Sequence, residues 1–271
     1  MNMALIMTAV KHGATVANYA ELTSLEKNAA GKITGAQVRD NLSGETWTVH
    51  AKGVINATGP FADELLTLSN PEGHKPIVSP SSGVHITLPN YYSPRKMGLL
   101  DAQTSDGRVI FFLPWQGNTI AGTTDSPSAV VRDPKPGEDD VEWVLDEVRN
   151  YLSPDIQVRR GDVLSAWSGL RPLVRDPSAK SSQAIVRNHL INVTEAGLLT
   201  VAGGKWTTYR AMAEEAVDEA VKVFGLTAGP CITAKVKLVG SDGWSPNMYI
   251  KLIQSVRYIS GFIEAKADSK F

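Results

Sequence analysis

Residues 203–210 read GGKWTTYR, and the stretch AMAEEAVDEAVKVFG, which has the pattern of a helix, follows at 211–225. Backbone N–H groups at the start of a helix, together with the helix dipole, attract an anion or the electron-rich edge of a ring. Gly203 and Gly204 allow close approach to the backbone, and Lys205 adds a positive charge. The spacing differs from that of a Walker A phosphate loop. The stretch predicts a ligand site at the start of a helix.

The residues after the lysine fit two interpretations. Thr207 and Thr208 can cap the helix or donate hydrogen bonds to a ligand, and Trp206 precedes them. The alternative for the whole stretch is an ordinary capped helix whose lysine extends into water. The residues by themselves leave both interpretations open.

A second stretch, GVINATGP at 53–60, has a similar character. An apolar strand ends there in small residues, just before a helix begins. Ala57, Thr58 and Gly59 leave room for a planar or phosphate-bearing ligand to approach the backbone at the carboxyl end of the strand. Any tight turn between a strand and a helix has similar residues, so this stretch alone is a weak signal.

The remaining sequence predicts a mixture of helices, a β-hairpin and antiparallel strands. A short apolar helix that is buried is expected before Gly13, and a short strand is expected at 15–19. Residues 33–40 and 46–53 flank a polar turn and predict a hairpin. Apolar and polar residues alternate in further predicted antiparallel strands, which are 81–89, 108–125 and 184–203. Within the second of these stretches, WQGN at 115–118 predicts a hairpin turn. Helices are predicted at 59–68, 137–152, 211–224 and 247–256.

Composition and charge are those of an ordinary globular chain. The 271 residues carry a net charge of −1, so there is no electrostatic argument for nucleic acid as a partner. Cys231 is the one cysteine, which excludes an internal disulfide and a CxxC motif, and no histidine spacing predicts a metal site. No apolar run approaches the length of about 18 residues that a membrane helix needs. We expect an α/β fold mixed with an antiparallel sheet, in two interleaved domains.

Three further side chains are candidates for chemistry. Arg171 lies in SAWSGLRPLVRD, an apolar stretch with turn residues, where an arginine needs a carboxylate or phosphate partner. Arg187 lies in a strand pattern, and a structural ion pair is the alternative for both arginines. His85 lies in the alternating strand SSGVHITLP, where a histidine is more often structural than catalytic.

Taken together, these stretches resemble the FAD-dependent glycerol-3-phosphate dehydrogenases, and the mitochondrial type in particular. The resemblance runs over about residues 1–253 and is carried by six stretches in the right order: HGATVANY, GVINATGPFAD, SPSSGVHITLP, FFLPWQGNTIAGTTD, SGLRPLVRD and GGKWTTYRAMAEEAVD. It implies oxidation of sn-glycerol 3-phosphate to dihydroxyacetone phosphate, with hydride transfer to FAD and electron transfer to quinone. It also implies association with the mitochondrial inner membrane.

The resemblance implies a role for each candidate residue. Arg171, Arg187 and Lys205 become candidate ligands of the substrate phosphate, and His85 becomes a candidate base for the proton of the C2 hydroxyl. Arg171 can serve either the phosphate or the alkoxide that develops at C2. The residues expected to bind FAD are Ala57, Thr58, Gly59, Gly203, Gly204, Lys205, Trp206, Thr207 and Thr208.

The implied fold is that of the glycine-oxidase-like flavoproteins, a Rossmann-type FAD domain interleaved with an antiparallel sheet that binds substrate. We expect four segments: a partial FAD domain at 1–75, the antiparallel domain at 76–165, a returning segment at 166–226, and a linker with the start of a helical domain at 227–271. The family's opening GxGxxG unit and its EF-hand region are not found, and the sequence after about residue 254 diverges from the family pattern. We therefore expect a truncated form that binds FAD weakly or not at all and is marginally stable.

Two other functions remain to be weighed. A related FAD-dependent amine or amino-acid oxidase would bind a substrate carboxylate with one arginine, whereas two arginines and a lysine here favour a phosphate. A non-catalytic fragment that acts only as a binding partner is the third possibility. Flavin content and substrate choice distinguish these alternatives.

Overall fold

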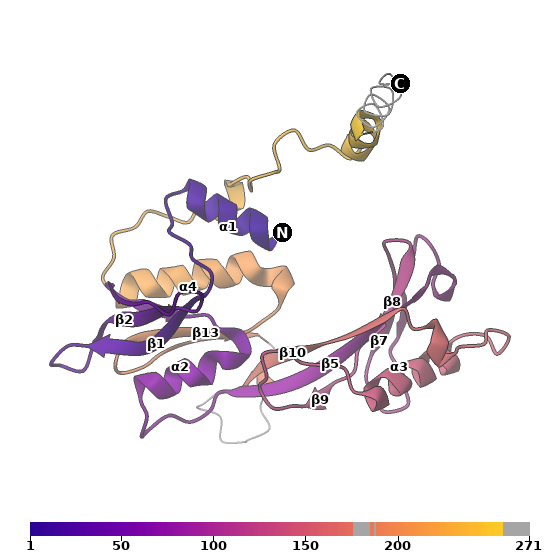
Figure 1. Cartoon of the computed structure of the whole chain (residues 1–271), viewed down its shortest axis with the longest axis horizontal. Helices are drawn as coiled ribbons and strands as arrows, with labels where there is room; N and C mark the ends of the chain where they lie inside the picture. The colour runs from indigo at the N-terminus through magenta and orange to yellow at the C-terminus, as the bar shows by residue number, and fades with distance from the viewer. Residues whose placement is uncertain (176–184, 187, 257–271) are drawn as a thin grey trace, which may run out of the picture. The chain divides into compact units, whose positions relative to one another are not determined.

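The computed structural model of the chain describes residues 1–175, 185–186 and 188–256 (Figure 1). The chain divides into two compact units. One consists of Met1–Ala20 with Pro230–Phe271, and the other is Glu21–Gly229. All strands from β2 onward lie in the second unit.

The first unit contains helix α1 (Asn2–Lys11) and the short turn η5 (Thr233–Lys235). The Thr8 hydroxyl donates to the carbonyl of Ala4 at 2.6 Å and accepts from the backbone N–H of Val239 at 2.9 Å. The helix predicted from the sequence is therefore confirmed, but its predicted burial is wrong, because Thr8 is the one buried residue of α1. An apolar composition does not bury a helix unless another element packs against it.

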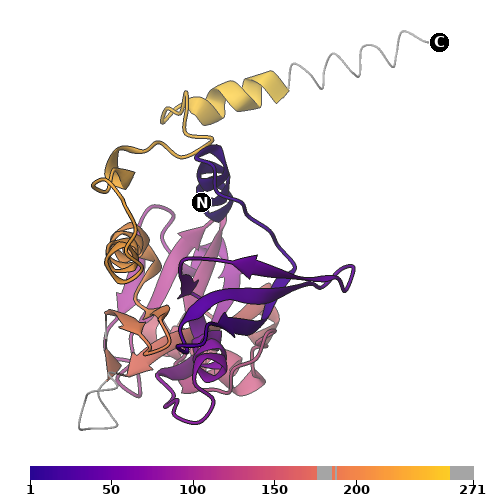
Figure 2. The same cartoon turned by 90° about the vertical axis from the view of Figure 1, so that its left-hand side faces the viewer.

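A three-stranded sheet contains β1 (Ala20–Lys27), β2 (Ile33–Asp40) and β3 (Thr46–His50) in that order (Figures 1 and 2). Strands β2 and β3 pair antiparallel, which confirms the predicted hairpin. The strand predicted at 15–19 is wrong, since the first strand begins at Ala20. Tyr19 has a φ of 56°, and this left-handed conformation interrupts the extended chain just before β1.

A second three-stranded sheet combines β4 (Val54–Asn56), β12 (His189–Val193) and β13 (Leu198–Gly203). Strands β12 and β13 pair antiparallel as predicted, but β13 also pairs in parallel with β4. Helices α2 (Ala62–Ser69) and α4 (Tyr209–Val223) follow β4 and β13 along the chain. The core beside this sheet consists of Ile33, Ala62, Leu66, Ile77, Val78, Val174, Leu198 and Ala202.

The largest sheet runs in the order β11-β10-β5-β8-β7-β6, and a short strand β9 pairs with β5. Its strands are β5 (Val78–Pro89), β6 (Leu99–Asp101), β7 (Ile110–Trp115), β8 (Asn118–Gly122), β9 (Ser126–Pro127), β10 (Ser165–Arg175) and β11 (Ile185–Val186). The predicted turn at 115–118 joins β7 to β8, whose Trp115 and Asn118 pair. The sheet is antiparallel, as the alternating pattern predicted.

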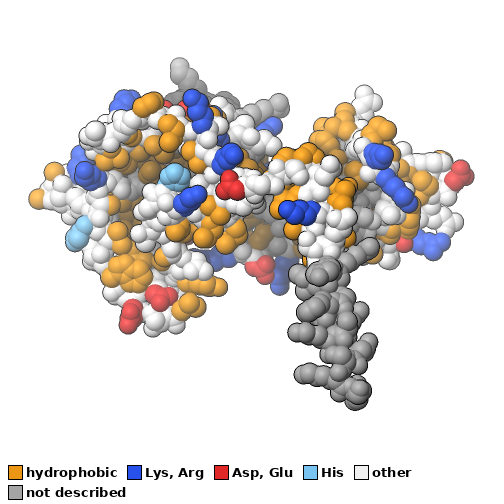
Figure 3. All heavy atoms as spheres, turned by 90° about the horizontal axis from the view of Figure 1, so that it is seen from above, with side chains coloured by type: hydrophobic (Ala, Val, Ile, Leu, Met, Phe, Trp, Pro, Cys, Tyr) orange, Lys and Arg blue, Asp and Glu red, His pale blue; other side chains and the backbone are white. Residues whose placement is uncertain are grey.

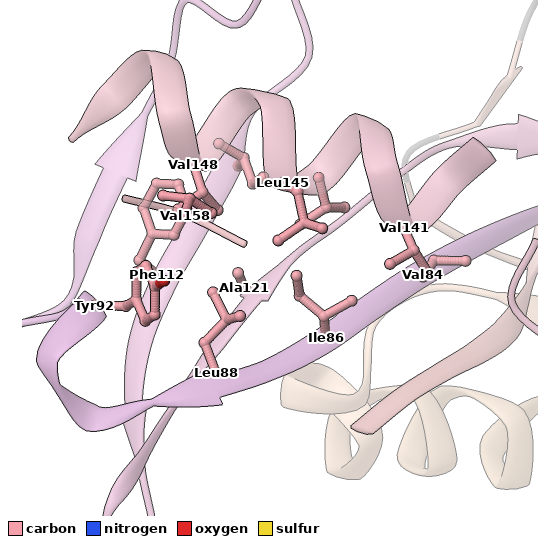
Figure 4. Close-up of a cluster of buried hydrophobic side chains, with 12 residues drawn as sticks. Val84, Ile86, Leu88, Tyr92, Phe112, Ala121, Val141, Leu145, Val148 and Val158 are labelled. Atoms are coloured by element: carbon pink, nitrogen blue, oxygen red, sulfur yellow. The ribbon is translucent and has the colours of Figure 1, made fainter. Parts of the chain in front are cut away.

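Helix α3 (Glu138–Tyr151) covers one face of this sheet. Figure 4 shows Val84, Ile86 and Leu88 of β5 pointing toward the helix, and all three are fully buried. Val141, Leu145 and Val148 project from α3 into the same core. Because side chains alternate along a strand, the odd-numbered residues between Gly83 and Thr87 lie on the face away from α3.

Strands β5 and β10 connect the two cores (Figure 1). Val78 and Val174 lie in the core of the β4–β13 sheet, whereas Val84 and Ile86 lie in the core under α3. These two long strands pair with each other from Ser165 to Val174. Because this strand pair is packed into a core at each end, the sheet face between the two cores that α3 does not cover is held in a fixed position.

Candidate active site

His85 and Arg171 lie on neighbouring strands and on the same open face of the large sheet. His85 pairs with Trp167 across β5 and β10, and Ser81 pairs with Arg171 four residues away. Directly opposed residues share a face, so Trp167 and Arg171 lie on the side of His85. The rings of His85 and Trp167 stack with centroids 5.5 Å apart and an angle of 8° between their planes. This stack fixes the plane of the imidazole.

Arg171 lies well inside the eleven-residue strand β10. The sequence had indicated a stretch rich in turns, and the structure shows a continuous strand. Its Nη2 donates to the Thr123 hydroxyl at 2.9 Å and to the Thr124 carbonyl at 3.1 Å. Its Nη1 donates to the Asp125 carboxylate at 3.2 Å and to the Ser82 carbonyl at 3.4 Å. The segment just after β8 thus provides three of the four acceptors.

Two glycines make room for these two side chains. A Cβ added to Gly83 would overlap the guanidinium of Arg171, so the guanidinium crosses β5 at Gly83, two residues from His85. A Cβ added to Gly122, which pairs with His85 across β5 and β8, would lie 2.6 Å from Cδ2 of the histidine ring. Arg171 and His85 therefore each lie against a glycine, whose lack of a side chain leaves room for them.

The electrostatics of His85 favour its neutral form. Burial lowers the pKa of His85 below its ordinary value of 6.5, and the positive charge of Arg171 lowers it further. A neutral imidazole at pH 7 can accept a proton. The pair therefore combines a proton acceptor with a cation.

The two glycine-containing stretches lie at one edge of the β4–β13 pair. These strands are parallel, and Asn56, the last residue of β4, pairs with Thr200. Carboxyl ends of parallel strands meet at one edge of a sheet, which is the usual place for a ligand in an open α/β sheet. The turn at 57–59 and the segment at 203–208 both leave from this edge.

Asn56 holds the first of these turns from inside. It is fully buried, and its amide donates to the carbonyl of Ala62 at 2.9 Å and to the Thr200 hydroxyl at 3.2 Å. Its side-chain oxygen accepts from the Thr58 hydroxyl at 2.7 Å and from the Thr58 N–H at 3.3 Å. Gly59 has a φ of 59°, and an added Cβ there would meet nothing within 4 Å. The turn is rigid on its inner side and open on its outer side.

The second segment ends in a helix start without a side-chain cap. Thr208 is the N-cap of α4, but its hydroxyl donates to the carbonyl of Lys205 at 2.9 Å and caps no N–H. Residues 204–208 are exposed. Gly203 and Gly204 both have a φ of 77°, and Cβ atoms there would collide with Val174 and Met212 respectively. The chain's own packing therefore requires both glycines.

The sequence matches a known family over most of its length. Residues 1–210 match the family described as FAD dependent oxidoreductase. The chain belongs to the FAD-dependent oxidoreductases. Its predicted fold class, mixed α/β with an antiparallel sheet as in the glycine-oxidase-like flavoproteins, is confirmed by this membership and by the solved structures of similar fold.

Individual relatives of this oxidoreductase carry more specific names. It is 57% identical over 255 residues to the probable mitochondrial glycerol-3-phosphate dehydrogenase of Caenorhabditis elegans, and 55% identical over 259 residues to the mitochondrial glycerol-3-phosphate dehydrogenase of Rattus norvegicus. Each match covers 94% of this chain but only 35% and 36% of the relative. The chain thus spans about a third of the length of these curated relatives.

A solved structure with the same kind of name is also similar to this oxidoreductase. The glycerol-3-phosphate dehydrogenase of Bacillus halodurans, complexed with FAD, superposes with a TM-score of 0.77 at 31% identity, over 93% of this chain and 48% of its own. Glycine oxidase from Geobacillus kaustophilus superposes with a TM-score of 0.55 at 18% identity, over 87% of this chain and 56% of its own. The second likeness concerns the fold alone.

The residues of this oxidoreductase fit part of a flavin site. The outer side of the turn at 57–59 is open, and the helical turn η4 (Trp206–Thr208), which leads into α4, begins beside Lys205 without a side-chain cap. Such a helix start suits a phosphate or the electron-rich edge of a flavin ring. Val174 of β10 lies against Gly203, so the strand that carries Arg171 passes beside this edge.

The predicted site residues thus fall into two groups. His85 and Arg171 lie together, and the residues at 57–59 and 203–208 share one sheet edge. None of the hydrogen bonds and ion pairs among the described residues joins Lys205 to His85 or Arg171. Arg187 lies outside the described residues. The assignment of each residue to substrate or FAD stays a prediction.

Sequence reasoning missed the partners of Arg171 and His85. Asp125 and Thr123 follow an apolar strand as the polar group TTD, and this polar ending was the available signal. Trp167 and Gly83 gave no such signal, because their roles depend on the register between β5 and β10. Register is set by tertiary packing and turn geometry.

Other parts of the described chain are less suited to this chemistry. A surface cleft of about 680 Å³, lined among others by Lys32, His74 and Glu195, contains none of the predicted site residues. No group of three metal-ligating side chains gathers within the described residues. Among the helices of the described part, none has the length and apolar character needed to cross a membrane. Charged and hydrophobic side chains are interspersed on the face shown in Figure 3.

Proposed function

We propose that this protein oxidises sn-glycerol 3-phosphate to dihydroxyacetone phosphate. The observation that carries the proposal is that His85 and Arg171 lie on one open sheet face, in a chain 57% and 55% identical to proteins named glycerol-3-phosphate dehydrogenase. A secondary alcohol that also bears a phosphate needs a proton acceptor and a cation near each other. His85 and Arg171 supply these two groups.

His85 takes the proton of the C2 hydroxyl. Its lowered pKa keeps the imidazole neutral at pH 7, and the stack on Trp167 holds the ring in one plane. FAD, when bound, supplies the acceptor for the hydride that leaves C2. The proton leaves the C2 oxygen and the hydride leaves the C2 carbon, so the role of His85 requires that it reach the hydroxyl.

Arg171 stabilises negative charge beside His85. The substrate phosphate and the alkoxide that develops at C2 both gain from a guanidinium held in place by four hydrogen bonds. Lys205 and Arg187 are the further cations that we assign to the phosphate. Positive charge at Arg171 and at these two further residues would let the site select an alcohol that carries a phosphate.

The FAD site in this proposal uses both stretches at the carboxyl edge of β4 and β13. Ala57, Thr58 and Gly59 would hold the dinucleotide, and the segment Gly203–Thr208 would hold the flavin end. The N–H groups at the start of the helical turn Trp206–Thr208, which has no side-chain cap, would support negative charge on the flavin ring. The proposal also includes the four segments expected from the sequence, at 1–75, 76–165, 166–226 and 227–271.

The proposal extends to the electron acceptor and the location. The relatives from Caenorhabditis elegans and Rattus norvegicus are named mitochondrial, and we propose the mitochondrion for this protein as well. Quinone as the electron acceptor and the inner membrane as the site of action complete the proposal. A lipid-soluble acceptor requires that the enzyme meet a membrane surface.

The proposal is tested with the visible absorption spectrum of the full chain. FAD is added in excess, and oxygen is removed. Glycerol 3-phosphate should then bleach the flavin bands, whereas glycerol, which lacks the phosphate, should not. Bleaching by small amino acids instead would favour the amine-oxidase alternative. Absence of bound flavin at every FAD concentration would leave the non-catalytic fragment as the better description of this chain.

A further inference from the structure

The guanidinium of Arg171 is fully engaged by its own chain at its terminal nitrogens. Nη1 and Nη2 carry four N–H bonds between them, and these donate to Thr123, Thr124, Asp125 and Ser82. An anionic ligand that approaches Arg171 must therefore compete with an acceptor that is already present. Which acceptor gives way depends on its charge, its distance and its access to water.

Three of the four acceptors are uncharged and fixed in the backbone or close to it. Thr124 is fully buried, and its hydroxyl accepts from the backbone N–H of Val84 at 3.0 Å. Its own N–H donates to the carbonyl of Val84 at 3.4 Å, so two hydrogen bonds join the segment after β8 to Val84 of β5. Arg171 thus keeps its position through Thr123, Thr124 and Ser82 even without a charged partner.

Asp125 differs from the other three acceptors in its charge and in its access to water, although its distance from the guanidinium is similar to theirs. It forms the one ion pair of Arg171 within the described residues, at 3.2 Å, and its side chain is 53% exposed. Its carboxylate also accepts a hydrogen bond from the hydroxyl of Ser81, the residue that pairs with Arg171 across the sheet. The carboxylate therefore has its own anchor at the solvent side of the guanidinium.

We propose that Asp125 is the resident counter-ion of Arg171 and sets how strongly the site holds an anionic group. Asp125 offsets the charge of Arg171 while the site has no substrate, and it gives way to a substrate phosphate. It acts through Arg171 and is a positioning and specificity-determining residue. The identity of the anion as the phosphate of glycerol 3-phosphate rests on the proposed function.

A counter-ion role and a merely structural role of Asp125 predict opposite changes in anion affinity when Asp125 is replaced. If Asp125 only supported the fold, its replacement would loosen Arg171 and weaken anion binding. If Asp125 is a competing counter-ion, an uncharged replacement of the same shape frees positive potential and strengthens anion binding. For an ion pair that is partly exposed, we expect a change of about two- to tenfold.

His85 provides a second readout in the same site. It is flanked by Trp167 of β10 and Gly122 of β8, and Arg171 is the charged group whose field lowers its pKa. Loss of the Asp125 charge leaves Arg171 less compensated. The pKa of His85 should therefore fall further in the Asp125→Asn variant.

The experiment compares the full chain with its Asp125→Asn variant, using inorganic phosphate as the probe. Titration calorimetry gives the Kd of phosphate, and NMR of the His85 ring against pH gives its pKa. We expect the variant to bind phosphate about two- to tenfold more tightly, with a lower pKa of His85. Asp133→Asn is the matched control, because it removes the same charge from an 86% exposed side chain, whose one ion pair within the described part of the chain is with Lys135 at 4.0 Å.

Weaker or unchanged phosphate binding in a folded Asp125→Asn variant would overturn the proposal, as would the absence of phosphate binding in both proteins. If that variant does not fold, Ser81→Ala gives a test of opposite sign. Without the Ser81 hydroxyl, Asp125 relies more on Arg171, and phosphate should bind more weakly.

Flavin bleaching by glycerol 3-phosphate is measured separately. If bleaching occurs without the Asp125 effect, only this inference fails; if the effect occurs without bleaching, only the proposed function fails.

Discussion

At the residue scale, the site depends on where side chains are missing. Gly83 lies under the guanidinium of Arg171, and its partner Gly169 across the β5–β10 pair has nothing within 4 Å of an added Cβ. Both glycines lie in the middle of long strands, where glycine costs conformational entropy. Comparison of alanine at Gly83 with alanine at Gly169 therefore distinguishes the need for space under Arg171 from the general effect of adding a side chain to a strand.

Gly83→Ala should displace Arg171 without unfolding the chain. The added Cβ overlaps the end of a flexible side chain, which can swing into water, so we expect phosphate to bind about tenfold or more weakly. Titration calorimetry with phosphate measures the effect, and circular dichroism checks the fold. Gly169→Ala is the control and should leave phosphate binding unchanged. Equal effects of the two substitutions would contradict this explanation.

His85 should give the reaction an acid limit below pH 6.5. The neutral imidazole is the form that accepts the proton, so activity is lost as the pH falls through the pKa of His85. Burial and the charge of Arg171 lower that pKa from 6.5, and therefore the limit lies below it. The pH profile of kcat/KM for flavin reduction measures this limit.

Trp167→Ala tests the cause of that shift. Removal of the stacked indole exposes the imidazole to water, which should raise the pKa of His85 back toward 6.5 and move the acid limit upward. Trp115→Ala is the control, since Trp115 is already exposed and lies at the tip of the β7–β8 hairpin. An NMR titration in which both variants keep the pKa of the parent chain would refute a role for Trp167.

At the scale of elements, the turn after β4 is held by one buried amide. Asn56 connects the start of α2, strand β13 and Thr58 through four hydrogen bonds. A buried polar side chain with all of its partners fixes a single geometry, and its loss leaves those partners unsatisfied. The turn at 57–59 therefore depends on a residue that does not reach its outer surface.

Asn56→Ala should lower the free energy of unfolding by about 2–4 kcal/mol, because the Ala62 carbonyl and the Thr200 hydroxyl lose a partner inside the core. Urea denaturation followed by circular dichroism measures this change. Thr58→Val removes only one of the hydrogen bonds and should cost about 1 kcal/mol or less. The explanation is wrong if the two variants are equally stable.

At the scale of the whole molecule, the chain's main cores lie in one of its two units. Every residue of the core under α3 and of the core beside β13 falls within 21–229. In the first unit, α1 has one buried residue, Thr8, which bonds to Val239 of the same unit. The burial that drives folding is therefore concentrated in the second unit.

A chain limited to 21–229 should fold by itself and keep the phosphate affinity of the full chain. It retains both cores, His85 and Arg171, so we expect a urea midpoint close to that of the full chain. Circular dichroism and titration calorimetry with phosphate measure the two properties. Loss of cooperative unfolding in the shorter chain would show that the first unit contributes to the cores.

The sequence by itself determined the elements with strong local patterns. Alternation in SSGVHITLP predicted β5, the turn residues at 115–118 predicted the β7–β8 hairpin, and the apolar stripe at 137–152 predicted α3. It also indicated His85 and Arg171 as candidates, since a histidine and an arginine are chemically distinctive anywhere in a chain. Local patterns carry this information because periodicity and turn chemistry act over a few residues.

Only the tertiary structure decided what lies beside these side chains. The parallel pairing of β13 with β4, the stack of Trp167 on His85, and the position of Asp125 at Arg171 join residues that are tens of positions apart in the chain. Strand register selects these neighbours, and a shift by one residue would send every side chain to the opposite face. Register results from the packing of both cores at once, which no single stretch of sequence contains.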